Sequence, residues 1–204
     1  DRAFSVRENL CLYMTELAVR TEPVLVPASE GARAPDNKAA FFYGTVLREP
    51  GPYGGNFRMW YHACHWPMNP DWKPEHAAQL ARYDYPCTVM GPVCYAESED
   101  GINWFKPALN QVSFYGATAN NAVNLPYIVN LVVNVIRDDE DPDPARRYKM
   151  AYQACPRFCE RTIPELGPVS TAALAVSSDG VHWQHHSVPY SGEFFEISSF
   201  YRFN

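Results

Sequence analysis

The stretch Tyr95-Ala-Glu-Ser-Glu-Asp-Gly-Ile-Asn-Trp104 decides the fold, because it returns in altered form as Leu174-Ala-Val-Ser-Ser-Asp-Gly-Val-His-Trp183. Both copies read as a strand, then Ser-x-Asp-Gly, then a β-branched residue, a polar residue and a tryptophan. The match extends upstream, where Phe57-Arg-Met-Trp-Tyr61 corresponds to Tyr148-Lys-Met-Ala-Tyr152. A multi-part unit that recurs in the same order is typical of a repeat architecture. Because each unit is built from strands, the sequence predicts an all-β protein of the β-propeller type.

The repeated Ser-x-Asp-Gly-x-x-Trp segment has the chemistry of a tight turn. The Asp carboxylate accepts backbone N–H groups, glycine supplies a positive φ, and the tryptophan folds back onto neighbouring strands. The segment resembles the Asp-box of sialidases and related propellers, in which such turns are structural. We therefore expect Asp100 and Asp179 to stabilise their turns and to have no catalytic role.

The repeat divides the chain into units of about 80 residues. We expect an N-terminal helix and strand in 1–38, a four-stranded blade in 39–108, a second blade in 120–190 and the start of a third in 194–204. The expected strands lie at 23–27, 41–47, 57–62 and 92–97, and at 128–136, 148–154 and 171–176, with an outer segment after each Ser-x-Asp-Gly turn. A closed propeller needs about 4–8 blades, but these 204 residues account for only about two and a half. We therefore expect the chain to be one part of a longer protein with five blades, in which the remaining blades close the ring.

Composition narrows the possible partners. The 204 residues include 20% charged residues and carry a net charge of −6, which disfavours a nucleic-acid partner. No apolar run reaches the ~18–20 residues of a membrane span. Aromatic residues make up 14% of the chain, a content that suits both the stacking of sugar faces and the packing of strands.

The cysteines and histidines leave two alternatives open. His62-Ala-Cys64-His65 and Cys155-Pro-Arg-Phe-Cys159 could hold a metal or close a disulfide, but neither has the paired spacing of a structural zinc site. We expect ordinary side chains, with no metal and no cofactor. The acidic run at 138–143 predicts a solvated turn, with a calcium site as the alternative. A chain that opens at Asp1 could follow a cleavage, which favours a secreted or periplasmic location.

With the repeat in place, residues 22–204 resemble the five-bladed propeller glycosidases, the superfamily of arabinanases, β-xylosidases, invertases and levansucrases. More narrowly, they resemble bacterial proteins described as glycosyl hydrolase family 32 N-terminal-like. The resemblance rests on Phe42-Tyr-Gly-Thr-Val46, Arg58-Met-Trp-Tyr61, Ala96-Glu-Ser-Glu-Asp-Gly-Ile-Asn-Trp104 with Lys106-Pro107, Asn120-Asn121, Arg147-Tyr-Lys149 and Ser177-Ser-Asp-Gly-Val-His-Trp183.

This resemblance implies a glycoside hydrolase that acts on oligo- or polysaccharide by paired-carboxylate acid/base chemistry. Such chemistry uses two carboxyl groups that flank the scissile bond, and in the resembled enzymes they project from the innermost strands near the channel mouth. The matching positions here are Asp36, Glu193 and Glu196. The residues expected to contact the sugar are Arg58, Trp66, Glu97, Asn120 and Asn121.

Two other functions stay open. The first is a catalytically inactive propeller that binds carbohydrate or protein, and it differs from a hydrolase in lacking two convergent carboxylates. The second is a sialidase-like enzyme, which requires an arginine cluster and a tyrosine nucleophile.

Overall fold

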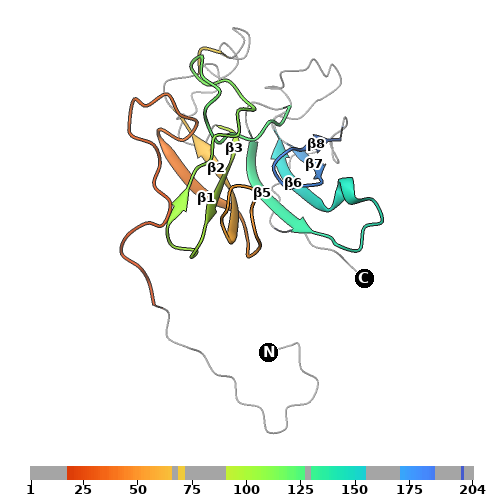
Figure 1. The fold of residues 1–204 in the computed structure, drawn as a ribbon. Helices are drawn as coiled ribbons and strands as arrows, with labels where there is room; N and C mark the ends of the chain where they lie inside the picture. Colours follow the sequence, from red (N-terminus) through yellow and green to blue (C-terminus); the bar gives the residue numbers. More distant parts are fainter. Residues whose placement is uncertain are drawn as a thin grey trace.

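The computed structural model describes residues 18–65, 69–71, 91–126, 130–154, 171–186 and 199. These residues form two antiparallel four-stranded sheets (Figure 1). Among them, the helical structure is a single 3-10 turn, η2 (Pro144–Arg146), in which the Ala145 N–H donates to the side chain of Asp143. The predicted all-β class is confirmed.

Each sheet is a meander in which neighbouring strands in sequence are neighbours in space. The first sheet has the order β1 (Ala39–Leu47), β2 (Phe57–Cys64), β3 (Val93–Ser98) and β4 (Trp104–Phe105). The second has the order β5 (Asn130–Arg137), β6 (Tyr148–Ala154), β7 (Thr171–Ser177) and β8 (Gln184–His185). In both sheets the Ser-x-Asp-Gly turn joins the third strand to the fourth, as the repeat predicts.

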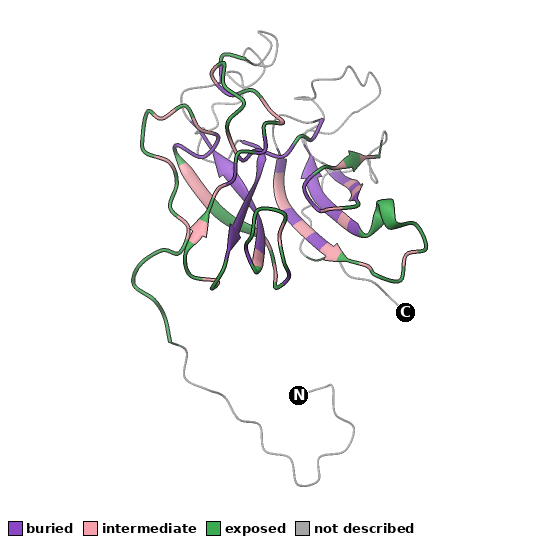
Figure 2. Cartoon of the chain, viewed as in Figure 1, coloured by how far each residue is buried: buried purple, intermediate pink, exposed green. Residues whose placement is uncertain are grey.

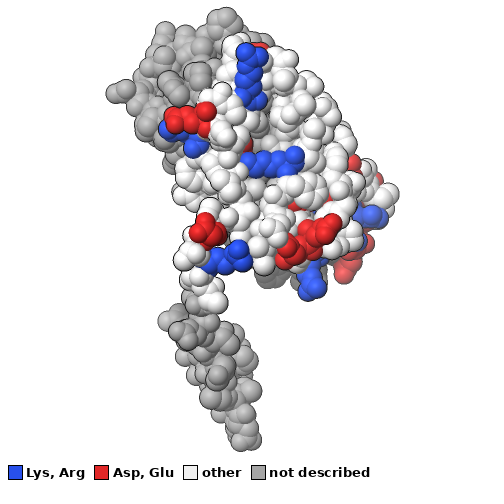
Figure 3. Space-filling model, turned by 60° about the vertical axis from the view of Figure 1, so that its left-hand side comes forward, with Lys and Arg blue, Asp and Glu red and all other residues white. Residues whose placement is uncertain are grey.

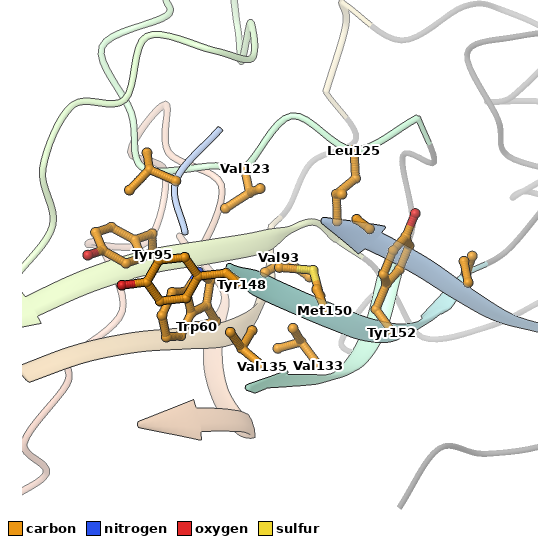
Figure 4. Close-up of a cluster of buried hydrophobic side chains, with 14 of the residues drawn as sticks. Trp60, Val93, Tyr95, Val123, Leu125, Val133, Val135, Tyr148, Met150 and Tyr152 are labelled. Atoms are coloured by element: carbon orange, nitrogen blue, oxygen red, sulfur yellow. The ribbon is translucent and has the colours of Figure 1, made fainter. Parts of the chain in front are cut away.

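The two sheets pack against each other, with β1 and β2 beside β5 (Figure 1). Their contact surfaces form the largest apolar cluster among the described residues, shown in Figure 4. Trp60, Val93 and Tyr95 come from the first sheet, and they meet side chains from the second sheet such as Val135 and Met150. β2 and β3 are buried along almost their whole length (Figure 2), which places the main core between the sheets.

The first strand of each sheet is interrupted by a β-bulge. In β1, Phe41 lies opposite His62 and Thr45 lies opposite Trp60, so β1 has two more residues than β2 between these pairs. In β5 the register shifts between Leu131 and Val133. Bulges redirect the side chains of the strand that carries them, and here they occur in the two strands that meet at the inter-sheet contact.

The segment before β1 differs from the expectation. Residues 23–27, predicted as a strand, have no regular structure. Pro23 and Pro27 lack the N–H that a sheet ladder requires, and no described strand pairs with this segment. The predicted helix at 1–20 lies outside the described residues except for 18–20, which are not helical, and the predicted third unit lies outside them except for Ser199. In the part of the chain that is described, no helix is long and apolar enough to cross a membrane.

Candidate functional site

Arg58 on β2 lies at the junction of the two sheets and is almost completely buried. Its Nε donates to the Tyr95 hydroxyl at 2.8 Å, and its Nη1 pairs with Glu49 at 2.9 Å. Its Nη2 donates to the carbonyl oxygen of Asp179 in the second sheet. Arg58 was predicted as a sugar contact. In the structure, each of its three guanidinium nitrogen atoms binds another residue of the protein.

Glu97 is fully buried and holds the β1–β2 hairpin. One of its carboxylate oxygens accepts the Gly55 N–H at 2.8 Å, the Tyr53 N–H lies 3.2 Å from both oxygens, and the Tyr95 hydroxyl donates to it at 2.7 Å. A Cβ atom at Gly51 would lie 2.2 Å from the Glu97 carboxyl group. Glu97, also predicted as a sugar contact, therefore fills a space that the glycine-rich turn leaves for it.

The Ser-x-Asp-Gly turn of the second sheet is docked onto the first. Besides the Arg58 contact, Trp60 Nε1 donates to the carbonyl oxygen of Gly180 at 2.9 Å. A Cβ atom at Gly180 would lie 2.6 Å from Arg58 Nη2, so glycine is needed there both for its φ of +74° and for the approach of the arginine.

Within both turns the aspartate has the local contacts expected of it. Asp100 Oδ1 accepts the N–H groups of Ile102 and Asn103 at 2.8 and 2.7 Å. Asp179 Oδ1 accepts those of Val181 and His182, both at 2.8 Å. Hydrogen bonds from two backbone N–H groups lower the pKa of Asp100. Burial raises the pKa of Asp179, but hydrogen bonds from His182 and the turn outweigh it and lower the value to about 2.

Asp36, the predicted catalytic carboxylate, lies just before β1 and is 1% exposed. Its Oδ2 accepts hydrogen bonds from the Tyr61 hydroxyl at 2.9 Å and from Lys106 Nζ at 2.5 Å. The Tyr61 hydroxyl in turn accepts a hydrogen bond from Asn121 Nδ2 at 2.8 Å. Asp36 and Asn121 thus belong to one buried polar cluster, and Lys106 supplies the cation that balances the carboxylate.

Asn120 and Asn121 do not begin the first strand of the second sheet, where the repeat placed them. They precede β5 and run beside β3, where Tyr95 N–H donates to the Asn121 carbonyl oxygen at 2.9 Å. Asn121 Nδ2 also donates to the Tyr95 carbonyl oxygen, and Asn120 binds backbone groups of its own loop at Val112 and Ala122. Both side chains shape the connection between the two sheets.

The predicted site residues therefore fall into two groups. Asp36 and Asn121 meet through Tyr61, whereas Arg58 and Glu97 meet through Tyr95. Asn120 belongs to neither group, because its side chain binds Val112 and Ala122 of its own loop. The other three predicted residues, Glu193, Glu196 and Trp66, lie outside the described residues.

An exposed aromatic surface on β1 was not predicted as part of the site. The rings of Phe41 and Tyr43 are stacked with centroids 6.3 Å apart and planes inclined by 25°. Tyr43 is 57% exposed, and Phe41 also contacts the ring of His62 edge-on. We name Phe41 and Tyr43 the aromatic platform. The run Phe41-Phe42-Tyr43, three aromatic residues in one strand, is the sequence signal that could have identified it.

His62 and Cys64 lie on β2 next to the aromatic platform. The distance from His62 Nε2 to Cys64 Sγ is 3.4 Å, and both residues are buried. Burial lowers the pKa of His62 to about 4, so its imidazole is neutral at physiological pH.

The acidic turn after β5 is balanced by nearby cations. Lys149 Nζ lies 2.7 Å from Asp138 and 2.9 Å from Asp141, and Arg137 pairs with Asp139 at 2.9 Å. On the face of the molecule in Figure 3, charges of both signs are scattered over a largely uncharged surface.

Three comparisons with known proteins, against family models, curated proteins and solved structures, give no match to this chain.

Proposed function

We propose that this chain forms part of a β-propeller that binds carbohydrate and hydrolyses its glycosidic bonds. The architecture is supported by the repeated four-stranded meander, by the Ser-x-Asp-Gly turn in the same place in each sheet, and by the packing of one sheet on the next. In a propeller such sheets are the blades, and their first strands line the central channel.

The aromatic platform is the observation that carries the proposal. Sugar rings present flat C–H faces that pack on aromatic side chains, and Phe41 and Tyr43 offer two stacked rings, with planes inclined by 25°, on one strand. Tyr43 lies within the bulge of β1, between the paired residues Phe41 and Thr45, where the strand departs from the regular ladder. In a globular protein, exposed aromatic rings grouped in this way often mark a binding surface.

Hydrolysis requires a pair of carboxyl groups, and we assign one to Asp36 and the other to Glu193 or Glu196. A carboxylate beside a lysine and a tyrosine is held in one orientation, as a catalytic base or nucleophile must be. A separation of about 5–5.5 Å between the two carboxyl groups would give retention, and about 6.5–9.5 Å would give inversion.

Binding is tested by isothermal titration of the chain with arabino-, xylo- and fructo-oligosaccharides. Tyr43→Ala should weaken binding at least tenfold, while Phe105→Ala should leave it unchanged. Phe105 is the matched control, because it is a similarly exposed aromatic residue on the opposite edge strand of the same sheet. Equal affinities of the wild type and both variants would contradict the platform.

Hydrolysis is tested separately by the release of reducing sugar. Asp36→Asn and Glu196→Gln should each lower turnover by about 10²–10⁴-fold while oligosaccharide binding is kept. Asp100→Asn serves as a carboxylate control and should retain turnover in the folded fraction.

Binding without hydrolysis is the second candidate, and a specific observation favours it. Asp36 is 1% exposed and already paired with Lys106, an arrangement that suits a structural ion pair as well as a catalytic one. Oligosaccharide binding with no detectable sugar release, and with an effect of Asp36→Asn on stability alone, would establish this function in place of the hydrolase.

A further inference from the structure

The segment before β1 folds back over the carboxylate of Asp36. The chain reverses in a turn in which the Ala32 N–H donates to the Ser29 carbonyl oxygen at 2.9 Å. Because of this turn, the Ala28 N–H lies 3.4 Å from Asp36 Oδ1, although the two residues are eight positions apart. Asp36 beneath the segment is 1% exposed. We name residues 24–28 the strap.

The strap is attached to the first sheet at few points. Leu25 packs against the apolar cluster on the face of the sheet that points away from the second sheet. The Val26 carbonyl oxygen accepts a hydrogen bond from Lys106 Nζ at 2.6 Å, and the same ammonium group lies 2.5 Å from Asp36 Oδ2. One cation therefore connects the strap to the carboxylate that it covers. The Val26 side chain itself is 60% exposed, and most of the strap is exposed (Figure 2).

We propose that the strap regulates access to Asp36, and that it must lift before this carboxylate can reach a sugar. The inference rests on the proposed function, which assigns Asp36 a catalytic role. The two carboxylate oxygens have different partners. Oδ2 is held by Tyr61 and Lys106, which both belong to the first sheet or its final turn, whereas Oδ1 accepts the Ala28 N–H of the strap. Lifting the strap frees Oδ1 for the substrate and leaves Oδ2 oriented by its two partners.

Lifting the strap breaks few contacts. The long hydrogen bond of Ala28, the bond between Lys106 and the Val26 carbonyl oxygen, and the packing of Leu25 are lost. Segments with few buried contacts and an exposed backbone open locally while the rest of the protein stays folded. Gly31, in the turn after the strap, has a φ of +82° and no atom within 4 Å of the position that a Cβ would occupy. It is therefore a suitable hinge.

A strap that is a fixed part of the core would make the same contacts with Asp36. The two interpretations differ in what happens when the strap is loosened. If the strap is a cover, Asp36 alone becomes accessible to a reagent in solution. If it is a fixed part of the core, loosening it disturbs the sheet beneath, and a fully buried carboxylate elsewhere in that sheet, such as Glu97, becomes accessible as well.

The experiment measures how fast a water-soluble carbodiimide couples glycine methyl ester to each carboxylate of the folded chain, with the labels located by mass spectrometry. Leu25→Asp replaces the apolar contact of the strap with a charge. It should raise the labelling rate of Asp36 by about tenfold or more and leave that of Glu97 unchanged. Val19→Asp is the matched control, because it adds the same charge to the same segment at a side chain that is 84% exposed. Both rates should stay at the wild-type value in this control.

The proposal is overturned if Leu25→Asp leaves the labelling rate of Asp36 unchanged, or if the rates of Asp36 and Glu97 rise together. Release of reducing sugar is measured on the same proteins at limiting oligosaccharide concentration. Leu25→Asp should be several-fold faster than the wild type, and Val19→Asp should match it. Unchanged turnover in a variant whose Asp36 is labelled faster would also overturn control by the strap. If none of the proteins releases sugar, the hydrolase is excluded, and the labelling of Asp36 still decides whether the strap is a cover.

Discussion

Trp60 of the first sheet donates its indole N–H to the carbonyl oxygen of Gly180, 120 residues further along the chain. Beside this bond, Arg58 reaches the carbonyl oxygen of Asp179. The turn that the sequence repeats is thus more than a local connection. In its second copy, it presents two backbone oxygens to the side chains of the preceding sheet.

Arg58 should be among the most important residues for stability. Arg58→Leu leaves the nearly buried carboxylate of Glu49 without its closest cation and the Asp179 carbonyl without its donor. Breaking a buried pair in this way should lower the free energy of unfolding by about 3–5 kcal/mol, as measured by urea denaturation.

Arg137 provides the control for Arg58, because it binds the other oxygen of Glu49 at 3.1 Å but is 40% exposed. Arg137→Leu should lower the free energy of unfolding by no more than about 1 kcal/mol. Similar losses for both variants would show that the inter-sheet position of Arg58 has no special importance.

The two turn glycines form a matched pair of test sites. Gly101 and Gly180 have φ values of +76° and +74°, so alanine is strained at either position by about 1–2 kcal/mol. At Gly101 the added methyl group meets only a phenylalanine ring at 3.6 Å, whereas at Gly180 it lies 2.6 Å from Arg58. Gly180→Ala should therefore destabilise the protein by about 1–3 kcal/mol more than Gly101→Ala does. Equal losses would mean that the second turn does not depend on its contact with the first sheet.

Replacing Glu97 should lower the stability of the folded protein, with or without a bound ligand. Glu97→Ala removes the acceptor of the Tyr53 and Gly55 N–H groups and of the Tyr95 hydroxyl. Leaving these groups unsatisfied in a buried site should cost at least about 2 kcal/mol in chemical denaturation. If the variant instead melts like the wild type and loses oligosaccharide binding, Glu97 has the sugar-binding role predicted from the sequence.

Acid should weaken the second turn through Asp179. Its pKa in the folded protein, about 2, is below its ordinary value of 3.8, so the ionised carboxylate contributes stability that is complete above about pH 4. That contribution is lost as the pH falls from 4 through 2. The difference in melting temperature between the wild type and Asp179→Asn should shrink over this interval. A difference that stays constant from pH 6 to pH 2 would rule out this linkage.

The strands and turns could be predicted because their signals are local. Short apolar runs rich in β-branched and aromatic residues are typical of strands, and the Asp-Gly pair favours a turn. The strand predicted at 23–27 failed for the complementary reason, since its valines suit a strand but a strand also needs a partner. The sequence of 23–27 alone does not show whether a neighbouring strand pairs with it.

The site was harder to predict because its contacts are distant in sequence. Nothing around Glu97 indicates that its carboxylate binds the turn at 53–55, although Gly51 and Gly55 are the two positions of this turn at which a Cβ atom would clash with Glu97. Likewise, the repeat alone assigned Asn120 and Asn121 to the wrong strand. Two residues that precede a repeat unit can belong to the connection that leads into it, and only the pairing with β3 distinguishes the two positions.

The contact of the second turn with Arg58 and Trp60 also constrains when the first sheet can finish folding during synthesis. A ribosome releases the first sheet long before it has synthesised residues 179 and 180, and until then the donors of Arg58 and Trp60 have no backbone oxygens to bind. The nascent first sheet therefore has an incomplete core and an exposed aromatic face, the state in which chains associate wrongly. A chaperone that binds during synthesis would have its greatest effect in this interval, before the second turn has emerged.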